Sequence, residues 1–149
     1  MAEAGFLIAE IRAVKKQGSN TFYLLNAGFN NLARPILYGA YHPMSVCPAR
    51  GRTPDGECDV VVGGPLCESG DIFTQAEGGF VEKRRLPQAA VGDFLTIHCA
   101  GAYSFAMGSN YNSMPLAAEV LISRKTPYLV RRRQSLDDLI AGECIPDYA

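Results

Sequence analysis

Three short segments of this sequence carry side chains that could bind or protonate a small charged molecule. The first is RPILY at residues 34–38, where Arg34 and Tyr38 stand four positions apart and would share one face of a helical turn. A guanidinium and a phenol on one face suit a bound carboxylate. A surface arginine whose stem packs on a tyrosine ring has the same pattern, so this pair alone leaves both interpretations open.

The second segment is GGPLCESGD at residues 63–71, in which glycines surround Cys67 and the carboxylates of Glu68 and Asp71 stand nearby. Glycine lets the backbone turn sharply and come close to a ligand. A thiol beside a carboxylate can serve as a proton donor, because the unperturbed thiol pKa is ~8.5. A polar turn that contains a buried cysteine is the alternative. The segment lacks the lysine of a phosphate-binding GxxxxGK[ST] loop, so that function is excluded.

The third segment, at residues 101–113, is rich in small and amide side chains around Tyr103 and Tyr111. Irregular stretches of this kind occur near binding sites, and they also form ordinary surface loops. The composition of this segment does not separate the two possibilities.

Short strands are the main elements expected to position these segments. Alternating apolar and polar residues predict a strand over residues 6–15. Further strands are expected at residues 22–25, at 60–62 running into Gly63, and at 94–99; a hairpin is expected over 120–130, with its turn at 125–127. Several short strands separated by glycine, proline and asparagine turns predict a single mainly β domain, either a barrel or a sandwich.

Two short helices and one loop complete the expected elements. Asn31 would cap a helix that ends at Tyr38. Ser135 would cap a second helix, which Gly142 would end. Residues 43–57 contain three prolines and two glycines, a composition that predicts an exposed loop.

Charge and hydropathy exclude several classes of protein. The 149 residues carry 14 basic and 15 acidic side chains, so a nucleic acid is not the expected partner. No apolar stretch approaches the ~20 residues that span a bilayer, which excludes a membrane protein of that kind. The first residues lack the basic and apolar layout of a signal peptide, and the sequence therefore predicts a cytoplasmic protein.

The five cysteines predict neither a disulfide framework nor a metal site. Their number is odd, their spacing is wide, and no CxxC pair is present. His42, Cys47 and Cys58 could be drawn together as metal ligands, but a loop histidine and two ordinary thiols explain them as well. We expect no metal.

Taken together, the three segments resemble one family. RPILYGAYH, GGPLCESGD and GAYSFAMGSNYNS, in that order, are similar to the C-terminal β-barrel domain of the diaminopimelate decarboxylases, which depend on pyridoxal 5'-phosphate and have the alanine-racemase-like fold. The likeness extends from about Gly5 to Glu143. The resemblance implies a Greek-key-like β-barrel over residues 1–149. It also implies a lyase, a carboxy-lyase that converts meso-2,6-diaminopimelate to L-lysine and CO2 in the last step of lysine biosynthesis.

The resemblance also assigns roles to individual residues. Arg34 and Tyr38 would hold a carboxylate of the substrate, and Glu68 would pair with the ammonium at its distal end. Cys67 would donate the proton that replaces the departing CO2. Tyr103 would contact the cofactor and help to close the pocket around the substrate. The family places Cys67 and Glu68 in the active site of the neighbouring subunit, which implies a homodimer.

The family's cofactor-binding lysine lies on a preceding (β/α)8 barrel of ~250 residues, for which 149 residues leave no room. The lysines of this sequence, Lys15, Lys16, Lys83 and Lys125, do not stand in that context. We therefore expect a C-terminal domain alone, excised or truncated, which is inactive without the barrel and binds no cofactor by itself.

Four positions depart from the family pattern: Asn26, Asn31, Cys99 and Met114. Asn26, Asn31 and Cys99 stand where aspartate is usual or frequent, and Met114 replaces a frequent arginine. The departures concern the hydrogen bonding around Tyr103 and the activity of the complete enzyme.

Two other functions are compatible with the sequence. A stand-alone barrel could act as a non-catalytic dimerisation partner or regulator of a full-length decarboxylase, but such a protein would not need all five site residues. An unrelated small β-barrel that binds amino acids would require the three ordered motifs to be a coincidence. An open reading frame extending upstream of Met1 would distinguish the regulator from the enzyme domain.

Overall fold

The computed structural model describes residues 1–49 and 51–148, and these form two compact units. The first unit spans Met1–Gly108 and the second begins at Ser109. The expectation of a single domain over residues 1–149 stays a prediction. A helix with the length and apolar character to cross a bilayer is absent from the described residues.

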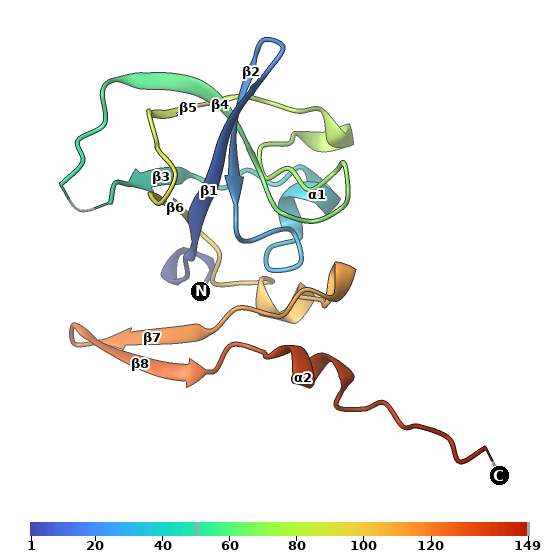
Figure 1. Cartoon of the computed structure of the whole chain (residues 1–149). Helices are drawn as coiled ribbons and strands as arrows, with labels where there is room; N and C mark the ends of the chain where they lie inside the picture. Colours follow the sequence, from blue (N-terminus) through green and yellow to red (C-terminus); the bar gives the residue numbers. More distant parts are fainter. Residues whose placement is uncertain (50, 149) are drawn as a thin grey trace. The chain divides into compact units, whose positions relative to one another are not determined.

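The first unit is a six-stranded, strongly curved sheet with one short α-helix (Figure 1). The strands lie in the order β3-β6-β1-β2-β4-β5, with only β2 and β4 parallel. The edge strands β3 and β5 contact each other, so the sheet is a nearly closed barrel, as predicted. The strands of this unit are β1 Leu7–Gln17, β2 Asn20–Leu25, β3 Met44–Cys47, β4 Glu57–Gly63, β5 Arg84–Pro87 and β6 Phe94–Ile97. Its helices are α1 Arg34–Tyr38 and the 3-10 turns η1 Ala2–Ala4, η2 Glu77–Gly79 and η3 Phe105–Met107.

Strand β1 joins the two halves of the barrel. It pairs with β6 as far as Glu10 and with β2 from Ile11 onward, and a bulge follows Ile11. Ala9 and Ile11 are buried while Ile8 and Arg12 are exposed, which confirms the predicted alternation. The bulge lets one strand serve both halves of the curved sheet.

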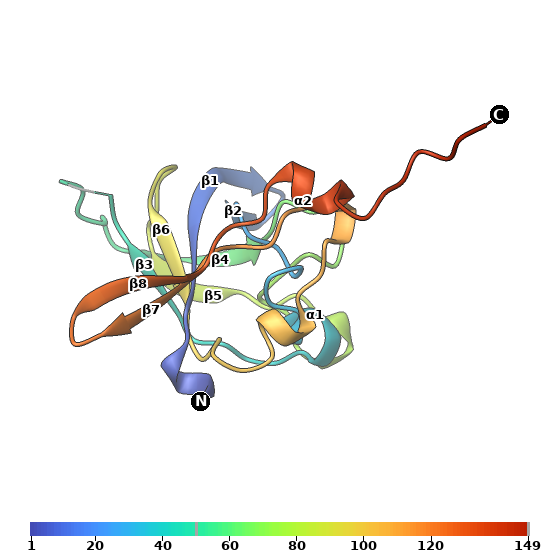
Figure 2. The same cartoon turned by 90° about the horizontal axis from the view of Figure 1, so that it is seen from below.

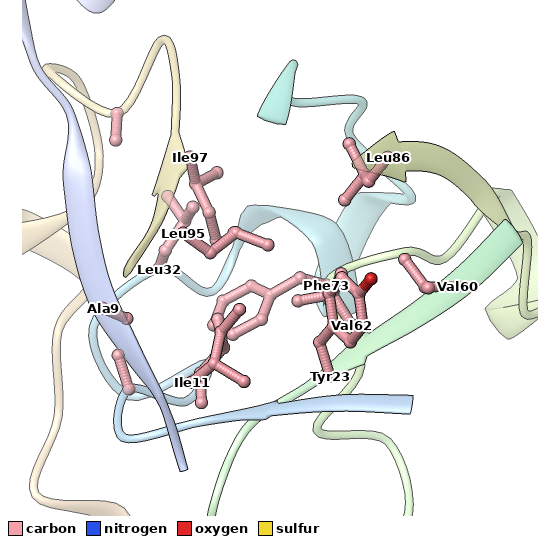
Figure 3. Packing of buried hydrophobic residues seen from close by; sticks show 13 residues of the cluster. Ala9, Ile11, Tyr23, Leu32, Val60, Val62, Phe73, Leu86, Leu95 and Ile97 are labelled. Carbon is pink, nitrogen blue, oxygen red and sulfur yellow. The ribbon is translucent and has the colours of Figure 1, made fainter. Parts of the chain in front are cut away.

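The core fills the barrel with side chains from every part of the sheet (Figure 3). The labelled residues Ile11, Val62, Phe73 and Leu95 are each at most 2% exposed. Tyr23 lies among them and donates a hydrogen bond from its hydroxyl to the Pro87 carbonyl at 3.0 Å. Burial and the neighbouring Cys58 thiol raise the pKa of Tyr23 to about 12. The core therefore contains a phenol that stays neutral.

Two sequence predictions about the sheet need correction. Residues 44–47 lie in strand β3, not in a loop, because Met44 and Val46 pack on the core while the strand pairs with β6. Strand β6 ends at Ile97, short of the predicted limit. Cys99 lies beyond it with a left-handed φ of 58°, so the chain turns there.

The second unit contains the predicted hairpin, drawn in orange in Figures 1 and 2. Strand β7 spans Glu119–Ser123 and β8 spans Thr126–Arg131. The turn is the pair Arg124 and Lys125, both with positive φ, and not residues 125–127 as predicted. Two left-handed residues match the twist of a two-residue hairpin loop, which leaves Thr126 free to pair with Ser123.

The 3-10 turn η4, Tyr111–Ser113, precedes the hairpin. Helix α2 follows the hairpin and spans Leu136–Ile140. Ser135 caps it as predicted: its hydroxyl accepts from the backbone N–H of Asp138, whose carboxylate accepts from the N–H of Ser135. Arg132 holds the same carboxylate with two hydrogen bonds. The helix ends as predicted just before Gly142, with Ala141 as its C-cap in a right-handed conformation; Gly142 itself lacks the positive φ of a left-handed cap.

Candidate active site

Helix α1 is short and is held in place by its ends. Pro35 lies in its first turn, where a missing N–H does no harm. Gly39 ends it with a left-handed φ of 60° and donates its N–H to the Pro35 carbonyl at 2.9 Å. A Cβ on Gly39 would overlap the backbone of Glu77, so α1 packs directly on η2. The predicted cap is wrong: Ala33 is the N-cap, and the Asn31 side chain donates to Asn30.

Arg34, Tyr38 and Tyr103 form what we call the Arg34 cluster. The guanidinium carbon of Arg34 lies 5.7 Å from the ring centroid of Tyr38 and 5.2 Å from that of Tyr103. Both distances are within the range of a cation–π contact. Both tyrosines are more than half exposed, and among the described residues Arg34 makes no ion pair. The first and third sequence segments thus meet around one uncompensated cation.

Tyr103 reaches Arg34 from a constrained stretch of backbone. Its φ is 63°, which is uncommon for a residue with a side chain. The preceding residues are tied to the N-terminus: Gly101 donates its N–H to the Ala2 carbonyl and Ala100 donates to that of Gly5. A Cβ on Gly101 would overlap backbone atoms of Met1, so only glycine allows this approach.

The second segment forms what we call the Cys67 loop, residues 64–71. Asp71 is buried at its end and accepts a backbone N–H on each oxygen, from Phe29 and from Leu66, both at 2.8 Å. Gly64 packs so closely on this carboxylate that a Cβ would overlap it. Burial raises the pKa of Asp71, the two N–H donors partly offset this, and the nearby Glu68 charge adds to the rise.

The two residues with predicted roles lie on the outside of the Cys67 loop. Cys67 and Glu68 are both exposed. Glu68 accepts hydrogen bonds on Oε1 from the Gly70 N–H at 3.0 Å and from the Ser69 hydroxyl at 3.3 Å. Gln75 fixes the loop from beneath, donating to the Gly70 carbonyl at 2.6 Å. The thiol is therefore exposed on a loop that hydrogen bonds of Asp71 and Gln75 hold in place.

Helix α1 separates the Arg34 cluster from the Cys67 loop. The Cys67 loop, green in Figure 1, lies beside α1. Ile36 of α1 makes the contact, because its Cδ1 lies 2.9 Å from the place a Cβ would take on Gly70. At ~100° per residue, Ile36 projects from the face of α1 opposite to Arg34 and Tyr38. The helix therefore turns one face to the loop and the other to Tyr103.

The side chains that could be drawn together as metal ligands have separate partners. His42 Nδ1 lies 2.9 Å from the His98 carbonyl, Cys47 lies near Thr96, and Cys58 lies near Tyr23. Within residues 1–49 and 51–148, no three histidine, cysteine or acidic side chains gather to hold a metal ion.

Sequence reasoning missed the residues that support the site. The sequence indicates Asp71 only as a carboxylate near a thiol, although in the structure it anchors the Cys67 loop. Gly39, Gly64 and Gly101 are required by close backbone packing. A glycine in or next to each functional motif is the signal in the sequence that could indicate such close packing. The residues that pack against these glycines cannot be identified from the sequence, because most of them are distant along the chain.

Comparison with known proteins identifies the family. The family model described as "Pyridoxal-dependent decarboxylase, C-terminal sheet domain" matches residues 2–101. The diaminopimelate decarboxylase of Escherichia coli (strain K12) is 50% identical over 147 residues, covering 97% of this chain and 35% of that protein. The diaminopimelate decarboxylase of Streptomyces coelicolor is 51% identical over 148 residues, covering 98% of this chain and 33% of that protein.

Solved structures agree with these relatives. A crystal structure of diaminopimelate decarboxylase aligns with a TM-score of 0.90 at 51% identity, covering 94% of this chain and 34% of the other. The enzyme from M. jannaschii in complex with L-lysine aligns with a TM-score of 0.86 at 34% identity, covering 97% and 31%. The chain spans about a third of the length of the curated relatives it matches. The chain belongs to the pyridoxal-dependent decarboxylase family, whose C-terminal sheet domain it contains.

Proposed function

We propose that this chain is the C-terminal domain of a diaminopimelate decarboxylase, which converts meso-2,6-diaminopimelate to L-lysine and CO2. The observation that carries the proposal is the meeting of two motifs at Arg34, a cation without an ion pair among the described residues. A cytoplasmic location of the complete enzyme is part of this proposal.

Arg34 and Tyr38 bind a carboxylate of the substrate in this proposal. A guanidinium can grip a carboxylate with two parallel N–H···O bonds, and the Tyr38 hydroxyl adds a third donor. Contacts with ring faces leave the N–H groups of Arg34 available for this purpose. Exposure of both tyrosines allows the ligand to approach.

Cys67 donates the proton in the proposed reaction. When the bond to the carboxylate breaks, its electron pair stays on the α-carbon as CO2 leaves, and the Sγ–H proton then forms the new C–H bond. The thiolate regains a proton from solvent, so the thiol acts as a general acid. Its exposed position on a supported loop suits transfer to a substrate that approaches from outside.

Glu68 recognises the distal ammonium of the substrate. Its exposed carboxylate is oriented by the Gly70 N–H and the Ser69 hydroxyl, and its negative charge complements an ammonium group. A site with both an anion-binding Arg34 and a cation-binding Glu68 favours a molecule with two amino-acid ends over lysine or ornithine.

The residues present fit contact with pyridoxal phosphate but not its covalent attachment. Tyr103 is exposed beside Arg34, and its hydroxyl makes no hydrogen bond within the described residues, so it can contact the cofactor. Lys83 instead donates to the Ser19 carbonyl, and Lys125 lies in the hairpin turn. The cofactor supplies an electron sink for the bond that breaks, and its lysine comes from beyond these 149 residues.

The complete enzyme is a homodimer in this proposal, with Cys67 and Glu68 serving the partner's site. The opposite faces of α1 support this arrangement, since Ile36 fills the side toward the Cys67 loop. Mixing an Arg34→Met enzyme with a Cys67→Ser enzyme tests it. Half of the dimers in an equal mixture are hybrids with one intact site of two, so about a quarter of wild-type activity returns. A mixture as inactive as its parents places both residues in one subunit's site.

A domain exchange tests the function itself. Residues 5–143 replace the matching part of the E. coli enzyme, which is 50% identical. The hybrid should release CO2 and lysine from diaminopimelate, and the same hybrid with Cys67→Ser should not. A hybrid that folds and dimerises without turnover would favour the non-catalytic partner or regulator instead.

A further inference from the structure

Tyr103 contacts Arg34 more closely than Tyr38 does. The guanidinium carbon lies 5.2 Å from the Tyr103 ring centroid and 5.7 Å from that of Tyr38. Tyr38 is on the same helix as Arg34, so their proximity follows from the i, i+4 spacing. Tyr103 comes from the segment after β6, and its position over Arg34 has to be built by the fold.

The fold builds that position with an uncommon backbone conformation. Tyr103 has a φ of 63°, and the Ser104 hydroxyl donates to the Ala100 carbonyl across the turn. Gly101 and Gly5 touch through their backbones, which ties the turn to the N-terminal segment. Disfavoured conformations held by surrounding structure are concentrated at functional sites. The observed conformation here serves to bring one aromatic ring over one arginine.

We propose that Tyr103 is a positioning residue for Arg34, and that its ring, not its hydroxyl, sets the affinity of Arg34 for the substrate carboxylate. The inference rests on the proposed function and adds a role to a residue otherwise assigned to the cofactor. An arginine side chain has several rotatable bonds, and Arg34 makes no ion pair within the described residues that would fix its guanidinium. Contact with a second ring, anchored elsewhere in the fold, restricts the guanidinium before a ligand arrives.

The contact also links two parts of the site. The hydroxyl end of Tyr103 is available to the cofactor, while its ring face lies against Arg34. One side chain therefore touches the substrate-binding cation and can touch the cofactor. Loss of the Tyr103 hydroxyl should therefore weaken binding of the cofactor, whereas loss of the ring should weaken binding of the substrate.

The first test needs neither cofactor nor activity. In an NMR spectrum of the 149-residue chain, the Nε–H resonance of Arg34, assigned with Arg34→Lys, should show a ring-current shift. Tyr103→Phe should keep that shift and Tyr103→Leu should reduce it. Tyr41→Leu is the matched control, because the exposed Tyr41 ring lies 4.5 Å from Arg84 instead. An Arg34 resonance that is the same with tyrosine and leucine at position 103 overturns the inference, whatever the function.

The second test uses steady-state kinetics of the complete enzyme. Tyr103→Leu should raise KM for diaminopimelate about two- to fivefold, the range expected for an exposed cation–π contact. Tyr103→Phe should leave KM for the substrate unchanged, even if cofactor binding weakens. In an Arg34→Met background, which is inactive, Tyr103→Leu should cause no further loss of affinity for diaminopimelate, measured as a Kd by calorimetry. Equal losses of affinity from Tyr103→Leu with arginine and with methionine at position 34 would refute positioning, whereas a complete enzyme that never turns over diaminopimelate refutes the proposed function and leaves the NMR result to decide.

Discussion

The Arg34 cluster and the Cys67 loop show two ways of presenting functional side chains. In the Arg34 cluster the functional residues contact one another, and the rings of Tyr38 and Tyr103 lie near one cation. In the Cys67 loop the buried contacts belong to Asp71, which has no part in the chemistry, and Cys67 remains exposed.

The difference indicates what each region can do within one chain. A cluster whose members restrain each other can bind a ligand as soon as one arrives. An exposed thiol on the far side of α1 fits the proposed homodimer, in which another subunit would provide the reacting centre. Changes confined to one region, followed by measurements on the other, can separate the two roles.

The largest expected effect is the loss of all decarboxylase activity when the two regions are tested without the rest of the enzyme. A polypeptide of these 149 residues should show no decarboxylation of diaminopimelate and no covalent lysine adduct with pyridoxal phosphate, because neither region supplies the attachment lysine. Visible absorbance, borohydride trapping and mass spectrometry would detect such an adduct. A stoichiometric, site-specific adduct on one of the four lysines would contradict the expectation.

The next largest effect should follow Cys67→Ser in the complete enzyme. A serine hydroxyl is a much weaker acid than a thiol, and positioned proton transfer is typically worth ~100- to 10,000-fold in rate. We expect a loss of this size in kcat with little change in KM, since Arg34 is untouched. Cys144→Ser, at another exposed cysteine, is the control and should be silent. An unchanged kcat for Cys67→Ser would remove the thiol from the mechanism.

Glu68→Gln should have a smaller effect, on substrate recognition. A hydrogen bond to a charged group is worth ~1.5–3 kcal/mol, which corresponds to roughly one to two decades in kcat/KM for diaminopimelate. Glu77→Gln, an exposed glutamate of η2, serves as the control. If kcat/KM is the same for both variants, the Glu68 carboxylate only shapes the loop.

Two glycine substitutions should separate the supports of the two regions. Gly64→Ala disturbs the packing on Asp71 and should mainly lower kcat, whereas Gly39→Ala disturbs α1 and should mainly raise KM. Each should lower the free energy of unfolding, measured with urea, by about 1–3 kcal/mol. Gly18 has a φ of 58°, close to the 60° of Gly39, and nothing within 4 Å of an added Cβ, so Gly18→Ala isolates the backbone cost of Gly39→Ala, about 1–2 kcal/mol. Identical kinetic changes in Gly64→Ala and Gly39→Ala would mean that the two regions move as one.

Local patterns predicted the elements whose stability is local. The alternation in β1, the Ser135 capping box and the i, i+4 pair of Arg34 and Tyr38 are all present in the structure. Each depends on residues close together in sequence, where spacing and hydrogen bonding set the geometry. The nearly closed barrel also followed from many short strands between turns.

Long-range contacts account for what the sequence pattern missed. Prolines at positions 43 and 48 flank residues 44–47, so the sequence does not suggest a strand there. Pairing with β6 nevertheless makes these residues a strand. The role of Asp71 depends on the N–H of Phe29, more than forty positions away. The closeness of Tyr103 and Arg34 depends on backbone packing at Gly101. None of these has a local signature.

The smallest predicted effect is a pH dependence confined to the Cys67 loop. The pKa of Asp71 lies above its ordinary value, chiefly because of burial and also because of the Glu68 charge. Between the ordinary value of about 3.9 and the folded-state pKa, the folded chain binds more protons than the unfolded one. The contribution of Asp71 to the free energy of unfolding therefore rises as pH falls through that window, opposite to the usual carboxylate. An NMR titration of the Asp71 carboxyl carbon should have its midpoint above 3.9.

The same titration distinguishes the two regions once more. Glu68→Gln removes the neighbouring charge and should lower the midpoint of Asp71 slightly, while burial keeps it above its ordinary value. Arg34→Met removes the guanidinium charge and should leave the midpoint unchanged, because Arg34 projects from the face of α1 opposite to Ile36 and the Cys67 loop. A midpoint that moves with Arg34 and not with Glu68 would mean that the charge on the cluster reaches through the helix. In that case the Cys67 loop and the Arg34 cluster would form one electrostatic site within a single chain, and the case for a second subunit would have to rest on the hybrid dimers alone.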